Sequence, residues 1–215
     1  QMCIRDSADA DSRLVCGLTN GAICIYGEAG QGEAMQVAPP SPNALLTGLI
    51  PNPGDRSDLC LAIYAASPEA SKGGTCHVLD VRNGQWLATL PESLGTSAAW
   101  SNKGKQLVLG LRSGELVQLT PEGEVKARLA PPPEVERPLY VEDVCWLENH
   151  VFIVTYNTVA DELVHEYDVF AVLRDAKSQS CTYAAFPLDV APPFGDVDRA
   201  GKRYVAALRA WDKEK

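Results

Sequence analysis

The stretch that sets the architecture of this chain runs from Leu107 to Leu119 and reads LVLGLRSGELVQL. An apolar strand, a Ser-Gly turn and a second apolar strand follow one another, which is the pattern of a β-hairpin. The run from Leu14 to Tyr26 reads LVCGLTNGAICIY and aligns with it without a gap. Leu, Val, Gly, Leu and Gly coincide at an offset of 93 residues (107 − 14). The chain therefore contains an internal repeat.

A second, shorter similarity within the chain pairs Ala99-Trp100 with Cys145-Trp146. Its offset is 46 residues (146 − 100), which is close to half of the 93-residue offset. A period of roughly 40 to 47 residues with about four short strands is the spacing of propeller blades. We therefore predict an all-β fold, a partial β-propeller of about four to five four-stranded antiparallel blades. The 15 prolines and 17 glycines agree with many short strands and turns.

The positions of these repeats also predict where the strands lie. The first blade is expected to end near residue 40. The strands of the second blade are expected at residues 45–50, 58–65, 75–81 and 85–90, and those of the third at 96–100, 105–111, 115–120 and 124–129. The strands of the fourth blade are expected at 141–147, 150–157, 166–173 and 180–187. Residues from about 203 to 211 would begin a fifth blade. Proline runs at 39–40, 131–133 and 192–193 separate the units, because proline cannot donate to a strand ladder. Ala66 to Lys72 is the stretch most open to a helical turn.

The ends of the chain divide it into two parts. Residues 1–7 are predicted to be a non-native, adapter-derived prefix, since the first residue is Gln1. Residues 8–215 are predicted to be an incomplete β-propeller domain, an internal piece of a longer protein, because no turn or cap follows Trp211. Incomplete rings leave the apolar faces of their terminal blades uncovered, so we expect poor solubility.

Composition and charge exclude several classes of protein. With 46% hydrophobic and 22% charged residues over 215 positions, the chain is globular rather than disordered. The net charge of −9 argues against direct binding of nucleic acid or a membrane surface, which need clustered Lys and Arg. No apolar run approaches the ~18 residues of a membrane span. Seven cysteines, an odd number without a C-x-x-C pair, indicate reduced thiols and an intracellular protein.

Residues that could carry metal or nucleophilic chemistry are scattered. The three histidines, His77, His150 and His165, are not at metal-ligand spacing, and the first two are expected in strands. There is neither a G-x-S-x-G elbow nor a phosphate-binding glycine loop. Ser101 to Lys105 is interpreted as a hairpin turn with solvated lysines. We predict no metal site and no cofactor.

Acidic side chains are the remaining catalytic candidates, since some propeller enzymes use paired acids around the central channel. By their positions near strand ends these are Asp143, Asp168, Asp196 and Asp198, and an ordinary solvated acidic surface is the favoured interpretation. The run from Asp196 to Arg199 has two of the alternating oxygen ligands of a calcium loop and lacks its Gly and Glu. We predict no catalytic residue.

Strand alternation also predicts burial. The tryptophans track the blades, so we interpret Trp86, Trp100, Trp146 and Trp211 as packing between blades. Period-two alternation predicts six buried positions: Leu107, Leu109, Leu116, Val151, Ile153 and Phe170. Turn chemistry predicts that Lys103, Lys105 and Glu122 are exposed.

Three stretches carry a resemblance to a known family. They are WSNKGKQLVLG at residues 100–110, GELVQLTPEG at 114–123, and VCWLENHVFIV at 144–154. Together they resemble the N-terminal β-propeller of cytoplasmic-face nucleoporins of the CAN type. The likeness continues from Pro192 to Trp211, covers residues 94–211 well and covers residues 12–90 loosely.

This resemblance implies a docking domain that is not an enzyme. In the family, a seven-bladed propeller at the start of a Phe-Gly-repeat protein holds an mRNA-export DEAD-box ATPase at the cytoplasmic side of the nuclear pore complex, among other nucleoporins. The helicase contact is largely electrostatic and lies on late-blade loops, so no partner-binding residue is assigned here. Two alternatives stay open: a generic WD-like propeller adaptor in another intracellular assembly, and, less favoured, a propeller hydrolase.

Overall fold

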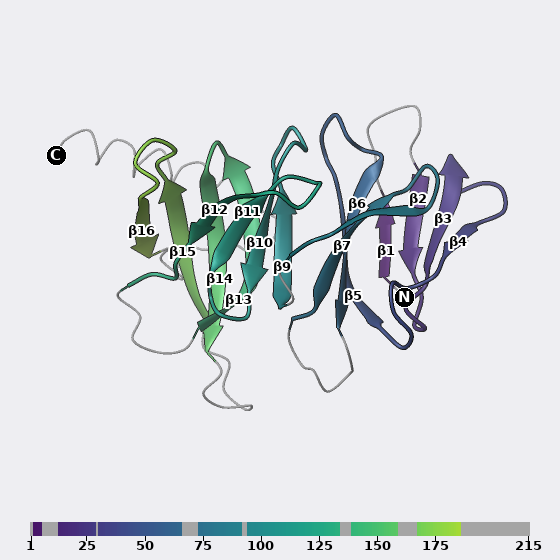
Figure 1. The fold of residues 1–215 in the computed structure, drawn as a ribbon, viewed down its shortest axis with the longest axis horizontal. Helices are drawn as coiled ribbons and strands as arrows, with labels where there is room; N and C mark the ends of the chain where they lie inside the picture. Colours follow the sequence, from purple (N-terminus) through teal and green to yellow (C-terminus); the bar gives the residue numbers. More distant parts are fainter. Residues whose placement is uncertain are drawn as a thin grey trace.

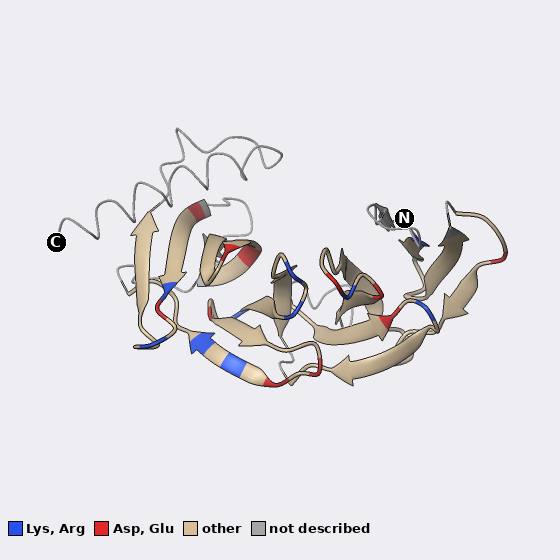
Figure 2. Ribbon diagram, turned by 90° about the horizontal axis from the view of Figure 1, so that it is seen from above, with Lys and Arg blue, Asp and Glu red and all other residues tan. Residues whose placement is uncertain are grey.

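Four antiparallel sheets of four strands each make up the computed structural model of this protein (Figure 1). The structure describes residues 2–5, 13–28, 30–65, 73–91, 94–133, 139–158 and 167–185. Within these ranges every regular element is a strand, and each sheet takes its strands in chain order. Seen from above, the sheets stand side by side along a curved row (Figure 2). The prediction of successive four-stranded propeller blades is confirmed.

The four sheets are blades 1 to 4, and the successive strands of each blade are called A, B, C and D. Blade 1 consists of β1 (Met2–Arg5), β2 (Arg13–Gly17), β3 (Ile23–Glu28) and β4 (Met35–Val37). Blade 2 consists of β5 (Leu45–Pro51), β6 (Leu59–Ala65), β7 (Thr75–Asp80) and β8 (Gln85–Thr89). Blade 3 consists of β9 (Gly95–Trp100), β10 (Leu107–Leu111), β11 (Leu116–Leu119) and β12 (Val125–Leu129). Blade 4 consists of β13 (Leu139–Glu148), β14 (Val151–Thr158), β15 (Tyr167–Arg174) and β16 (Cys181–Ala185).

The boundaries of blades 2 to 4 agree with those expected from the sequence to within two residues. Met2–Arg5, set aside above as part of a prefix, pairs with β2 as the first strand of blade 1. That residues 1–7 are foreign to the natural protein stays a prediction. The expected helical turn at 66–72 and the fifth blade at 203–211 lie outside the described residues.

The repeat has a direct structural counterpart. Its two copies are the hairpins β2–β3 and β10–β11, the middle strands of blades 1 and 3, so the 93-residue offset spans two blades. Both turns end on a left-handed glycine, Gly21 at φ 82° and Gly114 at φ 84°. Each glycine N–H donates to a carbonyl three residues back, Leu18 or Leu111, at 3.0 Å. Glycine recurs there because it adopts this conformation without steric cost.

The second glycine shared by the copies has a different role. A Cβ atom on Gly17 would lie 2.4 Å from Cδ2 of Leu46, and one on Gly110 would lie 2.3 Å from Cγ1 of Val141. Leu46 and Val141 both belong to the A strand of the following blade. Glycine on the B strand therefore allows the next blade to approach closely.

Most of the apolar core lies between blades, and a smaller cluster lies on blade 4 alone. One cluster joins blades 1 and 2, a second joins blades 2 and 3, and a third joins blades 3 and 4. All six positions predicted to be buried are at most 6% exposed: Leu107, Leu109, Leu116, Val151, Ile153 and Phe170. Lys103, Lys105 and Glu122 are exposed, as predicted. Four of the six lie in clusters between blades, whereas Val151 and Ile153 lie in the cluster on blade 4. Burial between neighbouring blades supplies hydrophobic stabilisation that a single blade lacks.

Three of the four tryptophans lie in described strands. Trp100 and Trp146 are buried on the A strands of blades 3 and 4, which confirms their packing role. The Trp100 indole also donates from Nε1 to the carbonyl of Ile50 in blade 2, at 2.9 Å. Trp86 on β8 is half-buried and packs against the cluster between blades 1 and 2. Trp211 lies outside the described residues.

Candidate docking surface

One face of the row gathers the loops that join strands A to B and strands C to D. Because consecutive strands are antiparallel, these loops leave the blades at one end and the B to C loops at the other. We call it the AB/CD face. Its described loops are residues 30–34, 52–58, 81–84, 101–106, 120–124, 149–150 and 175–180.

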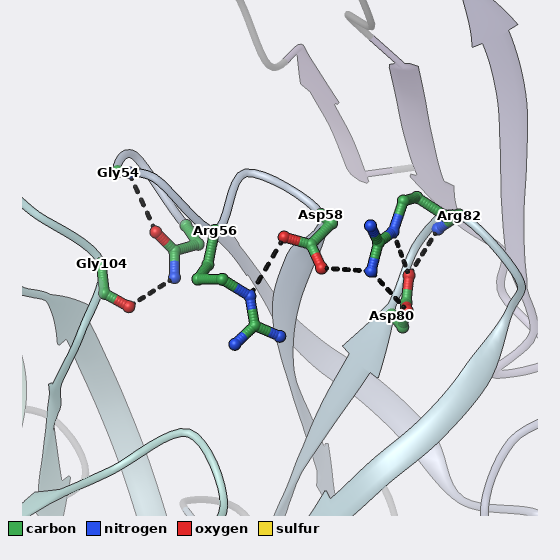
Figure 3. A network of polar contacts seen from close by, with 7 residues as sticks. Gly54, Arg56, Asp58, Asp80, Arg82 and Gly104 are labelled. Atoms are coloured by element: carbon green, nitrogen blue, oxygen red, sulfur yellow. Dashed lines mark hydrogen bonds and ion pairs between the residues drawn. The ribbon is translucent and has the colours of Figure 1, made fainter.

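Asparagines in the AB loops of blades 2 and 3 donate hydrogen bonds to the next blade. Asn52 is fully buried, and its Nδ2 donates to the carbonyl of Gly104 in the next blade at 2.8 Å (Figure 3). Its Oδ1 accepts from the N–H of Gly54 at 2.9 Å. Asn102 repeats the arrangement one blade further on, because its Nδ2 donates to the carbonyl of Leu147 at 3.1 Å. The AB/CD face is therefore a connected surface.

A network of ion pairs occupies this face on blade 2 (Figure 3). Nη2 of Arg82 lies 2.8 Å from Oδ2 of Asp58 and 3.3 Å from Oδ2 of Asp80. Nε of Arg56 lies 3.3 Å from Oδ1 of Asp58. Arg13 reaches across from blade 1 and donates to the Val81 carbonyl at 2.7 Å. The two arginines of blade 2 are thus already paired with carboxylates.

The ionisation of Asp80 follows from these contacts. Burial of its carboxylate opposes ionisation, but hydrogen bonds from the side chain and backbone of Arg82 favour the charged form, as do the charges of Arg82 and Arg13. The favourable contacts outweigh the burial, so the pKa of Asp80 lies below its ordinary value. Asp80 is therefore ionised at neutral pH, and its bonds with Arg82 hold the β7–β8 loop in place.

Charges of both signs alternate across the rest of the face. The turn from Ser101 to Lys105 is the predicted hairpin turn, closed by the Gly104 N–H donating to the Ser101 carbonyl at 2.7 Å. Lys103 and Lys105 project from it, whereas Glu122 and Glu124 occupy the β11–β12 loop of the same blade. Figure 2 shows basic and acidic positions interleaved along the row. Such a surface suits individual ion pairs with a protein better than it suits a polyanion.

His77 lies on β7, as predicted, and is a packing residue. Its Nδ1 and Nε2 are 3.0 and 2.9 Å from the hydroxyls of Thr89 and Thr75. Its ring makes edge-on contacts with Tyr64 and Trp86 between blades 1 and 2. Burial lowers the pKa of this imidazole, so it is neutral at pH 7.

The strand prediction for His150 was wrong. His150 is the second residue of the two-residue turn between β13 and β14, with a left-handed φ of 59°. β13 ends at Glu148 and β14 begins at Val151, so Asn149 and His150 alone reverse the chain. A turn of two residues needs a positive φ, and the pattern of apolar residues does not reveal where such a turn lies. His165 lies outside the described residues.

The predicted acidic candidates do not form a described pair. Asp143 on β13 is opposite Thr155, whereas Asp168 on β15 is opposite Tyr156. Thr155 and Tyr156 are consecutive on β14, so the two aspartates point to opposite faces of the sheet. Asp196 and Asp198 lie outside the described residues.

Two further findings concern metals and membranes. Among the described residues, no three His, Cys, Asp or Glu side chains converge as metal ligands would. In the same ranges, no helix is long and apolar enough to cross a membrane.

Comparison with known proteins defines the class of this domain as a nucleoporin β-propeller. The family described as the NUP159/214 beta propeller matches residues 4–215. The chain belongs to that family. The match also takes in the N-terminal half, where the motifs alone indicated only a loose likeness.

Two relatives show how far the similarity extends. Nucleoporin nup146 of Schizosaccharomyces pombe is 38% identical over 122 residues, which cover 54% of this chain and 9% of that protein. The human nuclear pore complex protein Nup214 is 33% identical over 129 residues, which cover 58% of this chain and 6% of that protein. The chain thus spans less than a tenth of the length of these relatives.

Solved structures agree on the fold. The N-terminal domain of Nup159 superposes with a TM-score of 0.63 and 16% identity, covering 87% of this chain and 48% of that one. A chain in the structure of S. cerevisiae Dbp5 bound to Nup159, Gle1, IP6 and ADP superposes with a TM-score of 0.59 and 16% identity, covering 85% of this chain and 46% of that one. U3-55K gives 0.58 with 11% identity, covering 85% and 53%. The fold is therefore shared beyond nucleoporins, and the family assignment rests on sequence.

Proposed function

We propose that this domain is a docking module of the nuclear pore complex, without catalytic chemistry of its own. In this proposal the intact propeller recruits an mRNA-export DEAD-box ATPase at the cytoplasmic side of the pore, next to other nucleoporins. The observation that carries the proposal is membership of the NUP159/214 family over residues 4–215. The solved assembly of Dbp5 with Nup159 supports the choice of partner.

The described surface is compatible with such a role. Its asparagine hydrogen bonds between blades and its ion pairs make a fixed array of loops with charges of both signs. A preformed surface loses little conformational freedom on binding, and exposed charges select a partner and raise the association rate. The chain's net charge of −9 complements a basic patch on an ATPase.

The test is a binding measurement with the ATPase at low and at high salt. We compare residues 1–215 with a longer form of the same protein that completes the propeller. Exposed ion pairs are screened over a Debye length of ~8 Å at physiological salt, so binding by the longer form should weaken as salt rises. A DEAD-box ATPase from a different step of RNA metabolism is the control.

The resemblance puts the helicase contact on late-blade loops, so residues 1–215 alone should bind weakly. Tight, salt-insensitive binding by residues 1–215 would contradict that placement. If the longer form binds neither ATPase, or both equally, the proposed function is wrong.

The generic adaptor remains the second candidate, because the fold is shared with U3-55K at a TM-score of 0.58, compared with 0.63 for the N-terminal domain of Nup159. An adaptor of another assembly should bind no mRNA-export ATPase in this experiment.

A further inference from the structure

Arg174, the last residue of β15, carries a guanidinium group with neutral partners. Its Nη1 donates to Oε1 of Gln118 on β11 at 3.0 Å and lies 3.3 Å from Nδ1 of His150. Its Nη2 donates to Oε1 of Gln179 in the β15–β16 loop. No acidic side chain among the described residues lies within ion-pair distance of Arg174. A positive charge is thus held at the junction of blades 3 and 4 without a counter-charge from these residues.

The nearest acid in sequence, Asp175, is engaged elsewhere. Its Oδ1 accepts from the backbone N–H groups of Lys177 at 2.6 Å and Ser178 at 3.2 Å. These bonds, above all, hold the pKa of Asp175 below its ordinary value. Asp175 therefore closes its own loop.

The surroundings of Arg174 are built at a cost to the backbone. Three non-glycine residues have a positive φ in the described ranges, and two of them, His150 at 59° and Gln179 at 60°, contact this guanidinium. Such conformations are energetically unfavourable for non-glycine residues and cluster at functional sites. Gln118 is fully buried, so its amide is fixed by packing. Three segments far apart in the sequence thus converge on one cation (Figure 1 labels β11, β14 and β15).

The contact with Arg174 defines the state of the histidine. A guanidinium can only donate, so the Nδ1 atom of His150 accepts and the imidazole is neutral. Partial burial, followed by the charge of Arg174, lowers the pKa of His150. Other titratable groups lie on the adjoining segments: Glu148 at the end of β13, Glu122 and Glu124 in the β11–β12 loop, Asp175 and Lys177 beyond β15, and Cys181 on β16, which pairs with Arg174.

We propose that Arg174, His150, Gln118 and Gln179 form a binding site for a single oxyanion carried by a peptide. The oxyanion is the carboxylate of an acidic segment or the phosphate of a phosphorylated side chain. The hydrogen bonds to Gln118, His150 and Gln179 use Nη1 and one N–H of Nη2, which leaves Nε–H and the second Nη2–H for bidentate recognition. The net charge of −9 favours one anchored group over a polyanion such as RNA.

Proton uptake is coupled to binding at this site. The positive charge of Arg174 helps to lower the pKa of His150, so an anion that neutralises Arg174 makes protonation of His150 less unfavourable. Binding of the anion should therefore raise the pKa of His150. By linkage, the anion should bind more tightly as the pH falls through that pKa.

The test follows the histidine resonances of residues 1–215 by NMR as the pH is varied. The additives are inorganic phosphate, a phosphoserine peptide, a glutamate-rich peptide and a neutral peptide of the same length. His77 is the internal reference, because both of its ring nitrogens are paired with threonine hydroxyls. We expect phosphate and at least one acidic peptide to raise the pKa of His150 and leave that of His77 unchanged.

Two variants that each remove one positive charge distinguish a specific binding site from non-specific electrostatic attraction. Arg174→Gln should abolish the effect of the anions on His150, whereas Lys177→Gln, an exposed cation three residues away, should retain it. Unchanged His77 resonances show that each variant is folded. The proposal is overturned if no acidic peptide moves the His150 pKa, if Arg174→Gln responds like the parent chain, or if single-stranded RNA acts at lower concentration than the peptides. None of these readings uses the ATPase, so they are independent of the proposed function.

Discussion

Gly110→Ala tests whether close approach of neighbouring blades limits the side chain on the B strand. The new Cβ would lie 2.3 Å from Cγ1 and 2.7 Å from Cβ of Val141. Val141 is fully buried and branched at Cβ, so its side chain cannot rotate away. Gly17→Ala is the matched control in blade 1, because its closest contact, 2.4 Å, is with Cδ2 at the flexible end of half-buried Leu46.

The expected magnitude is the difference of two effects. Overpacking of a buried site costs about 1–3 kcal/mol of unfolding free energy. Neither glycine has a positive φ, so alanine recovers about 0.4–1 kcal/mol by restricting the unfolded chain. We expect Gly110→Ala to lose about 1–2 kcal/mol and Gly17→Ala to lose less, near zero.

Urea unfolding measures both variants. Gly110→Ala should lower the midpoint with no change of slope, since the surface exposed on unfolding is the same. Val141→Ala should destabilise the Gly110→Ala variant less than it destabilises the parent chain, because removal of two methyl groups makes room for the new Cβ. The two changes should therefore be non-additive by at least about 0.5 kcal/mol. Equal midpoints for the two glycine variants, or strict additivity in the double variant, would refute the reasoning.

Three more outcomes are expected. Asn52→Ala should cost about 1–3 kcal/mol in urea unfolding, because it leaves the buried Gly104 carbonyl without its donor; a loss within error would contradict the tie between blades. Arg82→Gln should lower the thermal midpoint at neutral pH. This difference from the parent chain should vanish as the pH falls through the lowered pKa of Asp80, because a protonated carboxyl group is not stabilised by the cation. A difference that persists in acid would mean that the packing of Arg82, and not its charge, is responsible. The pKa of His77 is lowered in the folded state, so its contribution to stability is complete above the ordinary value near 6.5 and is lost as the pH falls through the folded value. His77→Gln should therefore make the free energy of unfolding less dependent on pH in this range, and an unchanged pH dependence would show that His77 is not its cause.

The boundaries of the strands were predictable because they depend on local patterns. Alternating burial, turn glycines and prolines act over a few residues, so blades 2 to 4 were located to within two residues. The motifs around Trp100 and Trp146 also identified the family, which the match over residues 4–215 confirms. Burial of the six apolar positions followed from the same alternation, as the exposures of Leu107 and Phe170 illustrate.

Contacts between distant segments were not predictable from one sequence. Gly110 and Gly114 both recur in the repeat, but only the packing of β13 shows that one permits close approach while the other makes a turn. Gln118, His150 and Arg174 are up to 56 residues apart, and no local pattern links them. Sequence by itself determined the strands and the family, because periodicity and turn chemistry are encoded in neighbouring residues. Tertiary structure alone decided which polar side chains meet, because that depends on how each blade is set against the next.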